Sequence, residues 1–206
     1  MLKVIPLQKV PKMTKALKEA DVFEIWADKL SKKDSEKIVY LAGKLKKPLI
    51  YKVTAKDFLK LNKTVLIASE YIDIDSECAK SFIKKIKKEN AKAKIIISHH
   101  DFKETPYDKE IKKIIAKMLK NKPDVIKLAL FARSVSDSFR ILDFLQDLNK
   151  KSIQSICIGM GEYGLLTRLS GDLFGNYMSY FALDENSKSA PDQITIQEFK
   201  KYRNES

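Results

Sequence analysis

The sequence predicts an α/β fold of the compact (β/α)8 TIM-barrel type. Short apolar runs rich in β-branched residues recur eight times along 206 residues, as buried parallel strands do. Amphipathic stretches separate them, and a chain of this length suits one small barrel. The expected strands cover residues 2–6, 22–26, 48–53, 71–75, 94–98, 125–129, 155–159 and 178–183.

The stretches between these runs carry apolar residues three and four positions apart, which predicts helices with one buried face. The clearest example places Val135, Phe139, Leu142, Leu145 and Leu148 on one face, with Ser134 as the expected N-cap. Residues 54–69 are ambiguous, because 64–68 could form a strand or a helix. A doubly wound open sheet is the alternative fold, but no Gly-x-Gly-x-x-Gly or P-loop follows a strand. We expect one domain over residues 1–206, with a frayed tail from about residue 200.

Charge and composition limit the partners that we expect. The net charge is +13, and nearly all of the positive charge is lysine spread along the predicted helices. This pattern favours a solvated lysine-rich surface that attracts a small anionic substrate, rather than a nucleic-acid-binding protein. No apolar run approaches the roughly 20 residues of a membrane span, so no membrane partner is expected. Cys78 and Cys157 have no metal-type spacing, which predicts reduced thiols in a cytoplasmic protein.

Lys127 is the most informative single residue, because it interrupts the apolar run 125–129. A charged ammonium in such a strand is costly unless it is paired or its pKa falls. A desolvated lysine near other cations is a nucleophilic amine suited to imine formation with a ketone. The alternative is a lysine whose stem packs while its head reaches water.

Other polar residues follow the expected strands, at the barrel end where chemistry takes place. His99 and His100, the only histidines in the chain, follow the fifth strand and suit proton transfer, although either could be structural. Glu24 and Asp28 close the second strand, and Arg168 follows a glycine-rich turn at 159–164. No His-x-His, His-Glu-x-x-His or Gly-x-Ser-x-Gly motif occurs, so we expect neither a metal site nor a serine triad.

Five segments in this order resemble the type I 3-dehydroquinate dehydratases. They are Phe-Glu-Ile-Trp-Ala-Asp at 23–28, Ser-His-His-Asp-Phe at 98–102, Asp-Val-Ile-Lys-Leu-Ala at 124–129, the glycine-rich block from 159 to Arg168 followed by Phe-Gly at 174–175, and Ser-Ala-Pro-Asp-Gln at 189–193. The resemblance runs from Glu24 to Gln193 and implies a (β/α)8 barrel. It further implies a homodimeric, cofactor-free lyase that dehydrates 3-dehydroquinate to 3-dehydroshikimate in the shikimate pathway of aromatic amino acid biosynthesis.

The resemblance also implies a role for each matching residue. Lys127 takes the position of the Schiff-base lysine, and His100 that of the general acid and base. Glu24 takes the position of a carboxylate that helps to orient this histidine and to bind substrate. The remaining matches are residues expected to hold the substrate, namely Arg168, Ser189, Gln193 and Asp28.

Three positions depart from the family pattern and leave the substrate open. The family's Glu-x-Arg-x-Asp has Trp26 in place of its arginine, and a second arginine aligns with Thr54. Lys52 or Lys56 could substitute, but without the planar fork that binds a carboxylate twice. Asp192 replaces a glycine. One alternative is therefore another Schiff-base lyase or aldolase acting on a different keto acid, and a second is a basic nucleic-acid-binding protein with a decayed site.

Overall fold

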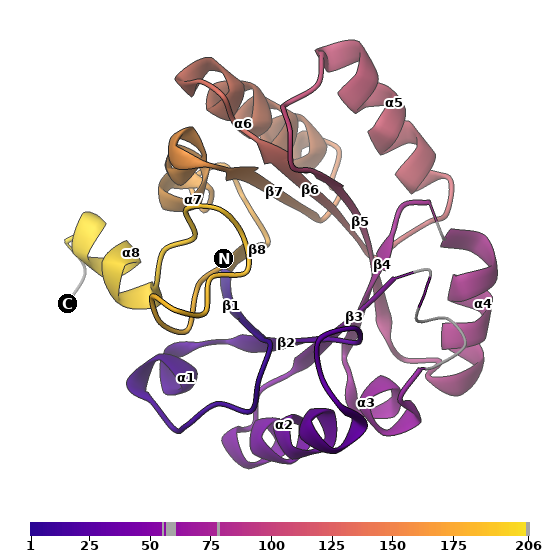
Figure 1. Cartoon of the computed structure of the whole chain (residues 1–206). Coiled ribbons are helices and arrows are strands. Elements are labelled where there is room, and N and C mark those ends of the chain that lie inside the picture. Colours follow the sequence, from indigo (N-terminus) through magenta and orange to yellow (C-terminus); the bar gives the residue numbers. More distant parts are fainter. Residues whose placement is uncertain (55, 57–60, 78, 205–206) are drawn as a thin grey trace.

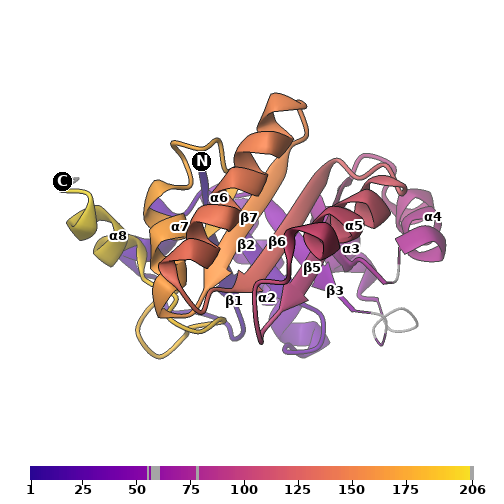
Figure 2. The same cartoon turned by 90° about the horizontal axis from the view of Figure 1, so that it is seen from above.

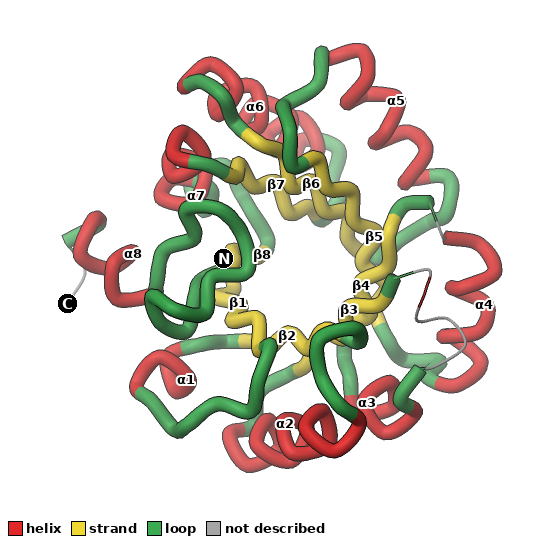
Figure 3. Tube along the Cα trace, viewed as in Figure 1, coloured by secondary structure: helices red, strands yellow, loops and turns green. Residues whose placement is uncertain are grey.

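A computed structural model describes residues 1–54, 56, 61–77 and 79–204. Within them, eight strands form one parallel sheet in the order β7-β6-β5-β4-β3-β2-β1-β8. The sheet curves into a nearly closed barrel with the helices around its outside (Figures 1 and 3). The backbone N–H of Tyr177, just before β8, donates to the Ser155 carbonyl at the start of β7 over 2.9 Å, which brings the two ends of the sheet together. The predicted barrel is thereby confirmed, and the open-sheet alternative is wrong.

The elements alternate along the chain (Figures 1 and 2). The strands are β1 Leu2–Leu7, β2 Val22–Trp26, β3 Leu49–Val53, β4 Tyr71–Asp75, β5 Lys94–Asp101, β6 Val125–Phe131, β7 Ser155–Met160 and β8 Met178–Tyr180. The helices are α1 Lys15–Glu19, α2 Lys32–Leu45, α3 Lys63–Ala68, α4 Ala79–Glu89, α5 Asp108–Leu119, α6 Val135–Lys150, the 3-10 turn η2 Glu162–Gly164, α7 Leu165–Ser170 and α8 Ile196–Tyr202. Each predicted strand corresponds to one observed strand.

Four strands run past their predicted ends, β1 and β7 by a single residue, and β8 is shorter than predicted because it ends at Tyr180. β5 continues to Asp101 and β6 to Phe131, and they pair in parallel with His100 opposite Ala129. Both histidines therefore lie within a strand and face opposite sides of the sheet. The ambiguous residues 64–68 belong to α3, because the Asn62 side chain accepts hydrogen bonds from the N–H groups of Thr64 and Val65 and caps the helix.

Strand alternation creates two separate hydrophobic clusters. Outward residues such as Ile72 and Ile74 of β4 pack beneath the helices in the larger cluster. Inward residues such as Ile50 and Tyr71 fill the lumen in a smaller one. Asp73 lies between Ile72 and Ile74 and therefore shares the inward face with Tyr71. Apolar side chains thus form a floor in the lumen, and charged side chains lie above them.

The α6 face and the C-terminal segment differ from the sequence expectation. Val135 and Phe139 are 50% and 54% exposed, so their predicted burial is wrong. Ser138 is buried instead, and its hydroxyl donates a hydrogen bond to the Tyr163 carbonyl over 2.6 Å. The spacing of apolar residues does not predict such a buried polar contact. α8 continues past residue 200, and Arg203 contacts both carboxylate oxygens of Asp172 at 2.7 Å.

Cys157 is a buried free thiol whose pKa burial raises to about 12, whereas Cys78 lies outside the described residues. A search of the described helices finds none with the length and apolar character that a membrane span requires.

Candidate active site

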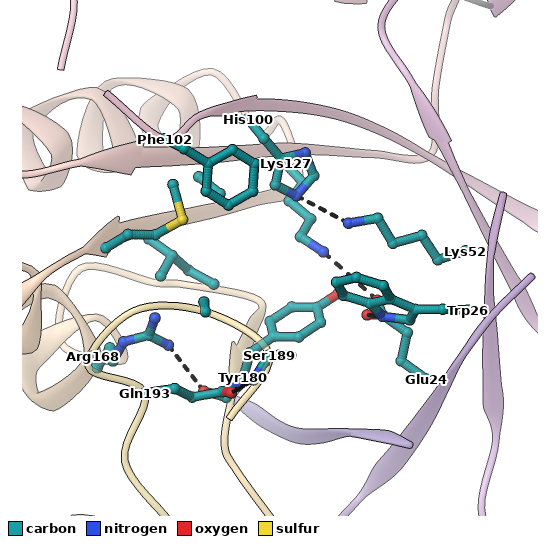
Figure 4. A pocket seen from close by; sticks show the side chains of 14 residues that line it. Glu24, Trp26, Lys52, His100, Phe102, Lys127, Arg168, Tyr180, Ser189 and Gln193 are labelled. Carbon is teal, nitrogen blue, oxygen red and sulfur yellow. Dashed lines mark hydrogen bonds and ion pairs between the residues drawn. The ribbon is translucent and has the colours of Figure 1, made fainter. Parts of the chain in front are cut away.

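The predicted site residues meet in a pocket at the carboxyl ends of the strands (Figure 4). The space between its lining atoms is about 450 Å³, part of which is open to solvent. Six of the seven residues chosen from the sequence line it, and Asp28 does not. The lining residues are Glu24, Trp26, Lys52, His100, Phe102, Lys127, Ala129, Ile158, Met160, Arg168, Tyr180, Ser189, Ala190 and Gln193.

Lys127 reaches the centre of the pocket from β6 and is only 3% exposed. Its Nζ donates to Asp73 Oδ2 over 3.0 Å and lies 3.6 Å from Glu24 Oε2. The same nitrogen stands 3.9 Å from the centre of the Tyr180 ring, so an aromatic face covers its third side. Two carboxylates and a ring therefore hold the amine in one place.

The charge state of Lys127 follows from these neighbours. Burial alone would lower its pKa, but the carboxylates of Asp73 and Glu24 outweigh burial and raise the pKa well above the ordinary lysine value. The sequence offered pairing or a lowered pKa as ways to keep a lysine here, and the structure has pairing. Lys127 is thus an ammonium, which must give up a proton before it can attack a carbonyl.

Glu24 connects Lys127 to the second strand. It is 1% exposed, and its Oε1 accepts a hydrogen bond from the indole nitrogen of Trp26 over 2.6 Å. Its other oxygen faces the Lys127 ammonium. Trp26 thereby fixes the carboxylate, although the sequence marked this position only as the loss of an arginine.

His100 faces the pocket from β5, and both His99 and His100 line a neighbouring groove. The His100 ring stacks on Phe102 with 5.9 Å between centroids and 11° between planes. Burial, followed by the positive charges of Lys52 and Lys127, lowers the pKa of His100 well below its ordinary value. The imidazole is therefore neutral near pH 7 and able to accept a proton.

The glycine-rich turn places Arg168 in the opposite wall. A Cβ on Gly164 would stand 2.3 Å from the backbone of Gly159, so only glycine lets α7 approach β7 this closely. Arg168 is 2% exposed, and its Nη1 donates to the Tyr180 carbonyl over 2.9 Å. Burial lowers its pKa to about 10, with the charge of Asp192 acting in the other direction.

The loop before α8 closes the same wall. Gln193 Oε1 accepts hydrogen bonds from the backbone N–H of Ser189 over 2.7 Å and from its hydroxyl over 3.0 Å. The Gln193 Nε2 is buried and has no hydrogen-bond partner within the described part of the chain. An unpaired buried donor in a pocket wall is suited to a ligand oxygen.

Asp28 lies apart from this constellation. Its side chain is 43% exposed and forms a 3.5 Å ion pair with Lys29. It borders the neighbouring groove, together with His99 and Lys56.

Sequence reasoning missed Asp73 and Tyr180. Asp73 is fully buried, and Tyr180 packs against Lys127. Asp73 could have been found by the argument used for Lys127, since it too is a charged residue inside an apolar strand. A buried charge of one sign calls for a partner of the other sign.

Comparison with known proteins identifies the family. A model of the type I 3-dehydroquinase family matches residues 5–205. The chain belongs to the type I 3-dehydroquinase family. Its resemblance to these dehydratases, inferred from short motifs, is therefore confirmed.

Curated relatives of this chain are named 3-dehydroquinate dehydratases, alone or as part of a bifunctional protein. The 3-dehydroquinate dehydratase of Methanocaldococcus jannaschii is 34% identical over 200 residues, which cover 90% of this chain and 87% of the relative. That of Methanococcus maripaludis strain C6 is 39% identical over 134 residues, or 64% of this chain and 59% of the relative. A bifunctional chloroplastic dehydratase/dehydrogenase of Arabidopsis thaliana is 31% identical over 144 residues, 69% of this chain and 23% of its own length. Several alignments thus span well under two thirds of the relative.

Solved dehydroquinase structures share the barrel. The 3-dehydroquinate dehydratase of Aquifex aeolicus superposes with a TM-score of 0.79 at 25% identity, covering 99% of this chain and 98% of the other. The type I enzyme of Clostridium difficile gives 0.78 at 24% identity, covering 98% and 91%.

Proposed function

We propose that this protein dehydrates 3-dehydroquinate to 3-dehydroshikimate through an imine on Lys127. The observation that carries the proposal is the placement of one buried amine between two carboxylates, in a pocket that also holds a neutral histidine and an arginine. The family membership supports the same activity.

The residues divide the reaction into steps. Lys127 Nζ, after passing a proton to a neighbouring base, attacks the C3 carbonyl, and water leaves as the imine forms. The protonated imine withdraws electrons, so that His100 removes a proton from C2. The C1 hydroxyl then departs as water with the proton from His100. A further water hydrolyses the imine and releases the product, so that the net change is the loss of one water.

The opposite wall is suited to the substrate carboxylate. Among the described residues, the Tyr180 carbonyl is the hydrogen-bond acceptor of the buried Arg168 guanidinium, and no carboxylate forms an ion pair with it. Gln193 Nε2 offers another donor beside it. Glu24 lies in the same pocket, where it accepts a hydrogen bond from Trp26 and forms an ion pair with Lys127.

The direct test is turnover of 3-dehydroquinate, followed by the ultraviolet absorbance of the conjugated product. We expect dehydration of this substrate without added metal or cofactor. Absence of turnover with a folded protein, together with imine trapping by another keto acid, would favour the alternative Schiff-base lyase. Salt-sensitive nucleic-acid binding without turnover would favour the decayed-site alternative.

The pH dependence offers a second test. Because the pKa of His100 is lowered, its neutral form persists below pH 6.5, and protonation on further acidification removes the base. We expect kcat/KM to be flat near neutrality and to fall only below the ordinary histidine range. A pH–rate profile from pH 4 to 8 measures this, and an acid limb at or above pH 6.5 would contradict it.

Arg168→Lys is expected to raise KM for 3-dehydroquinate at least tenfold, a loss of about 1.4 kcal/mol. Lysine cannot present two parallel donors to a carboxylate. Steady-state kinetics measure the change, and Arg133→Lys, the same replacement at an exposed arginine, is the control. An unchanged KM would mean that another cation holds the carboxylate.

We further propose that the chain acts as a single-domain, homodimeric, cytoplasmic enzyme without a nucleic-acid partner. Size-exclusion chromatography with light scattering tests the dimer, and a monomer at micromolar concentration would contradict it.

A further inference from the structure

Lys52 is a second amine in the same pocket, and its side chain is partly buried. It extends from β3, and its Nζ lies 3.2 Å from His100 Nε2. The same Nζ stands 4.5 Å from the centre of the Trp26 ring, which is its neighbour across the β2–β3 pair. Figure 4 shows the Lys52 side chain reaching over Trp26 to the edge of His100.

Among the described residues, no carboxylate lies within ion-pair distance of this amine. The ion pairs of the pocket join Lys127 to Asp73 and Glu24, and none within the described residues includes Lys52. An aromatic face attracts a cation, but it does not cancel the charge. Lys52 therefore exerts its charge on the group that it touches, which is the imidazole.

Charged groups approach His100 from several strands. Lys52 on β3 and Lys127 on β6 disfavour its protonated form, whereas Asp73 on β4 favours it. His99, the adjacent residue on β5, acts in the same direction as the lysines. The groove outside His100 is bordered by Asp28, Lys56, Asp75 and Glu77. Asp73 is paired with Lys127, whereas Lys52 has no ion-pair partner among the described residues and lies 3.2 Å from the ring.

We propose that Lys52 is a positioning residue of this reaction, which acts through His100 to keep the imidazole neutral before proton removal and strongly acidic afterwards. The proposal rests on the proposed dehydration. An ammonium that donates to Nε2 places the proton of the neutral ring on Nδ1. His100 then takes the C2 proton at Nε2, which breaks the hydrogen bond from Lys52 and leaves two positive charges side by side. Their repulsion favours transfer of that proton to the departing C1 hydroxyl.

The test is the titration of His100 by ring-resonance NMR in the full chain, where only two histidines need assignment. Lys52→Met removes the charge and keeps most of the stem. We expect the pKa of His100 to rise by about one unit or more, the usual size of such a charge effect, and the acid limb of kcat/KM to move upward with it. Lys52→Arg retains the charge and should restore most of the shift.

The control is Lys63→Met, which removes one positive charge from a lysine that is 73% exposed and should leave the titration unchanged. A His100 pKa that stays the same or falls in folded Lys52→Met overturns the proposal. Borohydride trapping separates the two hypotheses. If the imine still forms on Lys127 while the titration is unmoved, only the role of Lys52 fails. If the wild-type protein neither traps nor turns over the substrate, the dehydration fails, and the titration still measures the coupling.

Discussion

Replacing Lys127 with alanine is expected to reduce turnover of 3-dehydroquinate to background. No other group in the pocket can supply the electron-withdrawing imine in the same position, so the C2 proton would remain weakly acidic. The change also leaves Asp73 and Glu24 facing each other without their shared cation. Loss of one partner from a buried ion pair costs about 3–5 kcal/mol, so thermal unfolding must be measured beside the rate.

Lys127→Arg separates chemistry from stability. Arginine keeps a positive charge beside the two carboxylates but cannot form the imine, because its guanidinium stays protonated. We expect this variant to retain more stability than Lys127→Ala and to be equally inactive. Measurable turnover by Lys127→Arg at more than a few per cent of wild type would contradict an imine mechanism.

Chemical trapping decides between the two amines of the pocket. Borohydride added with 3-dehydroquinate should inactivate the wild-type protein and add the mass of the reduced ligand to the peptide that holds Lys127. Lys52 is the relevant competitor, because burial and the charge of Lys127 lower its pKa and so make its neutral form more accessible. Label on Lys52 would assign the nucleophile to β3 instead of β6.

The barrel could be predicted from the sequence because its strands are buried on both faces. Each strand is a short apolar run, and eight such runs between helices leave few arrangements of layers. Strand ends were less predictable. β5 and β6 continue through His99-His100-Asp101 and Leu130-Phe131, where polar residues or a flanking turn concealed the pairing. The exposed Phe139 illustrates a related limit, since apolar spacing alone does not say which neighbouring element covers a face.

Much of the site could also be predicted, but its electrostatics could not. Position in a strand and motif order located Lys127, His100 and Arg168. The charge state of Lys127 depends on Asp73, which lies 54 residues earlier on β4, one strand removed from β6 in the sheet. Such a pairing depends on the order and stagger of the strands, and neither is written in local sequence. The contact between Lys52 and His100 has the same origin.

His100→Ala is expected to lower kcat by roughly 10²–10⁴, the usual contribution of a general acid and base. His100 reaches the pocket beside Lys127, whereas His99, the adjacent residue of β5, faces the other side of the sheet. His99→Ala is therefore the matched control, because it removes the same side chain from the adjacent residue, and we expect a change of less than about threefold in kcat, below that general acid–base range.

Trapping makes the role of His100 specific. In the proposed mechanism the imine forms on Lys127 before His100 takes the C2 proton, so His100→Ala should still be labelled when borohydride and 3-dehydroquinate are added together. The expected result is a variant that accumulates the covalent intermediate and turns it over slowly. Loss of labelling in a folded His100→Ala protein would place the histidine in imine formation instead. A larger loss of kcat in His99→Ala than in His100→Ala would contradict the inward orientation of His100, and with it the assignment of the base.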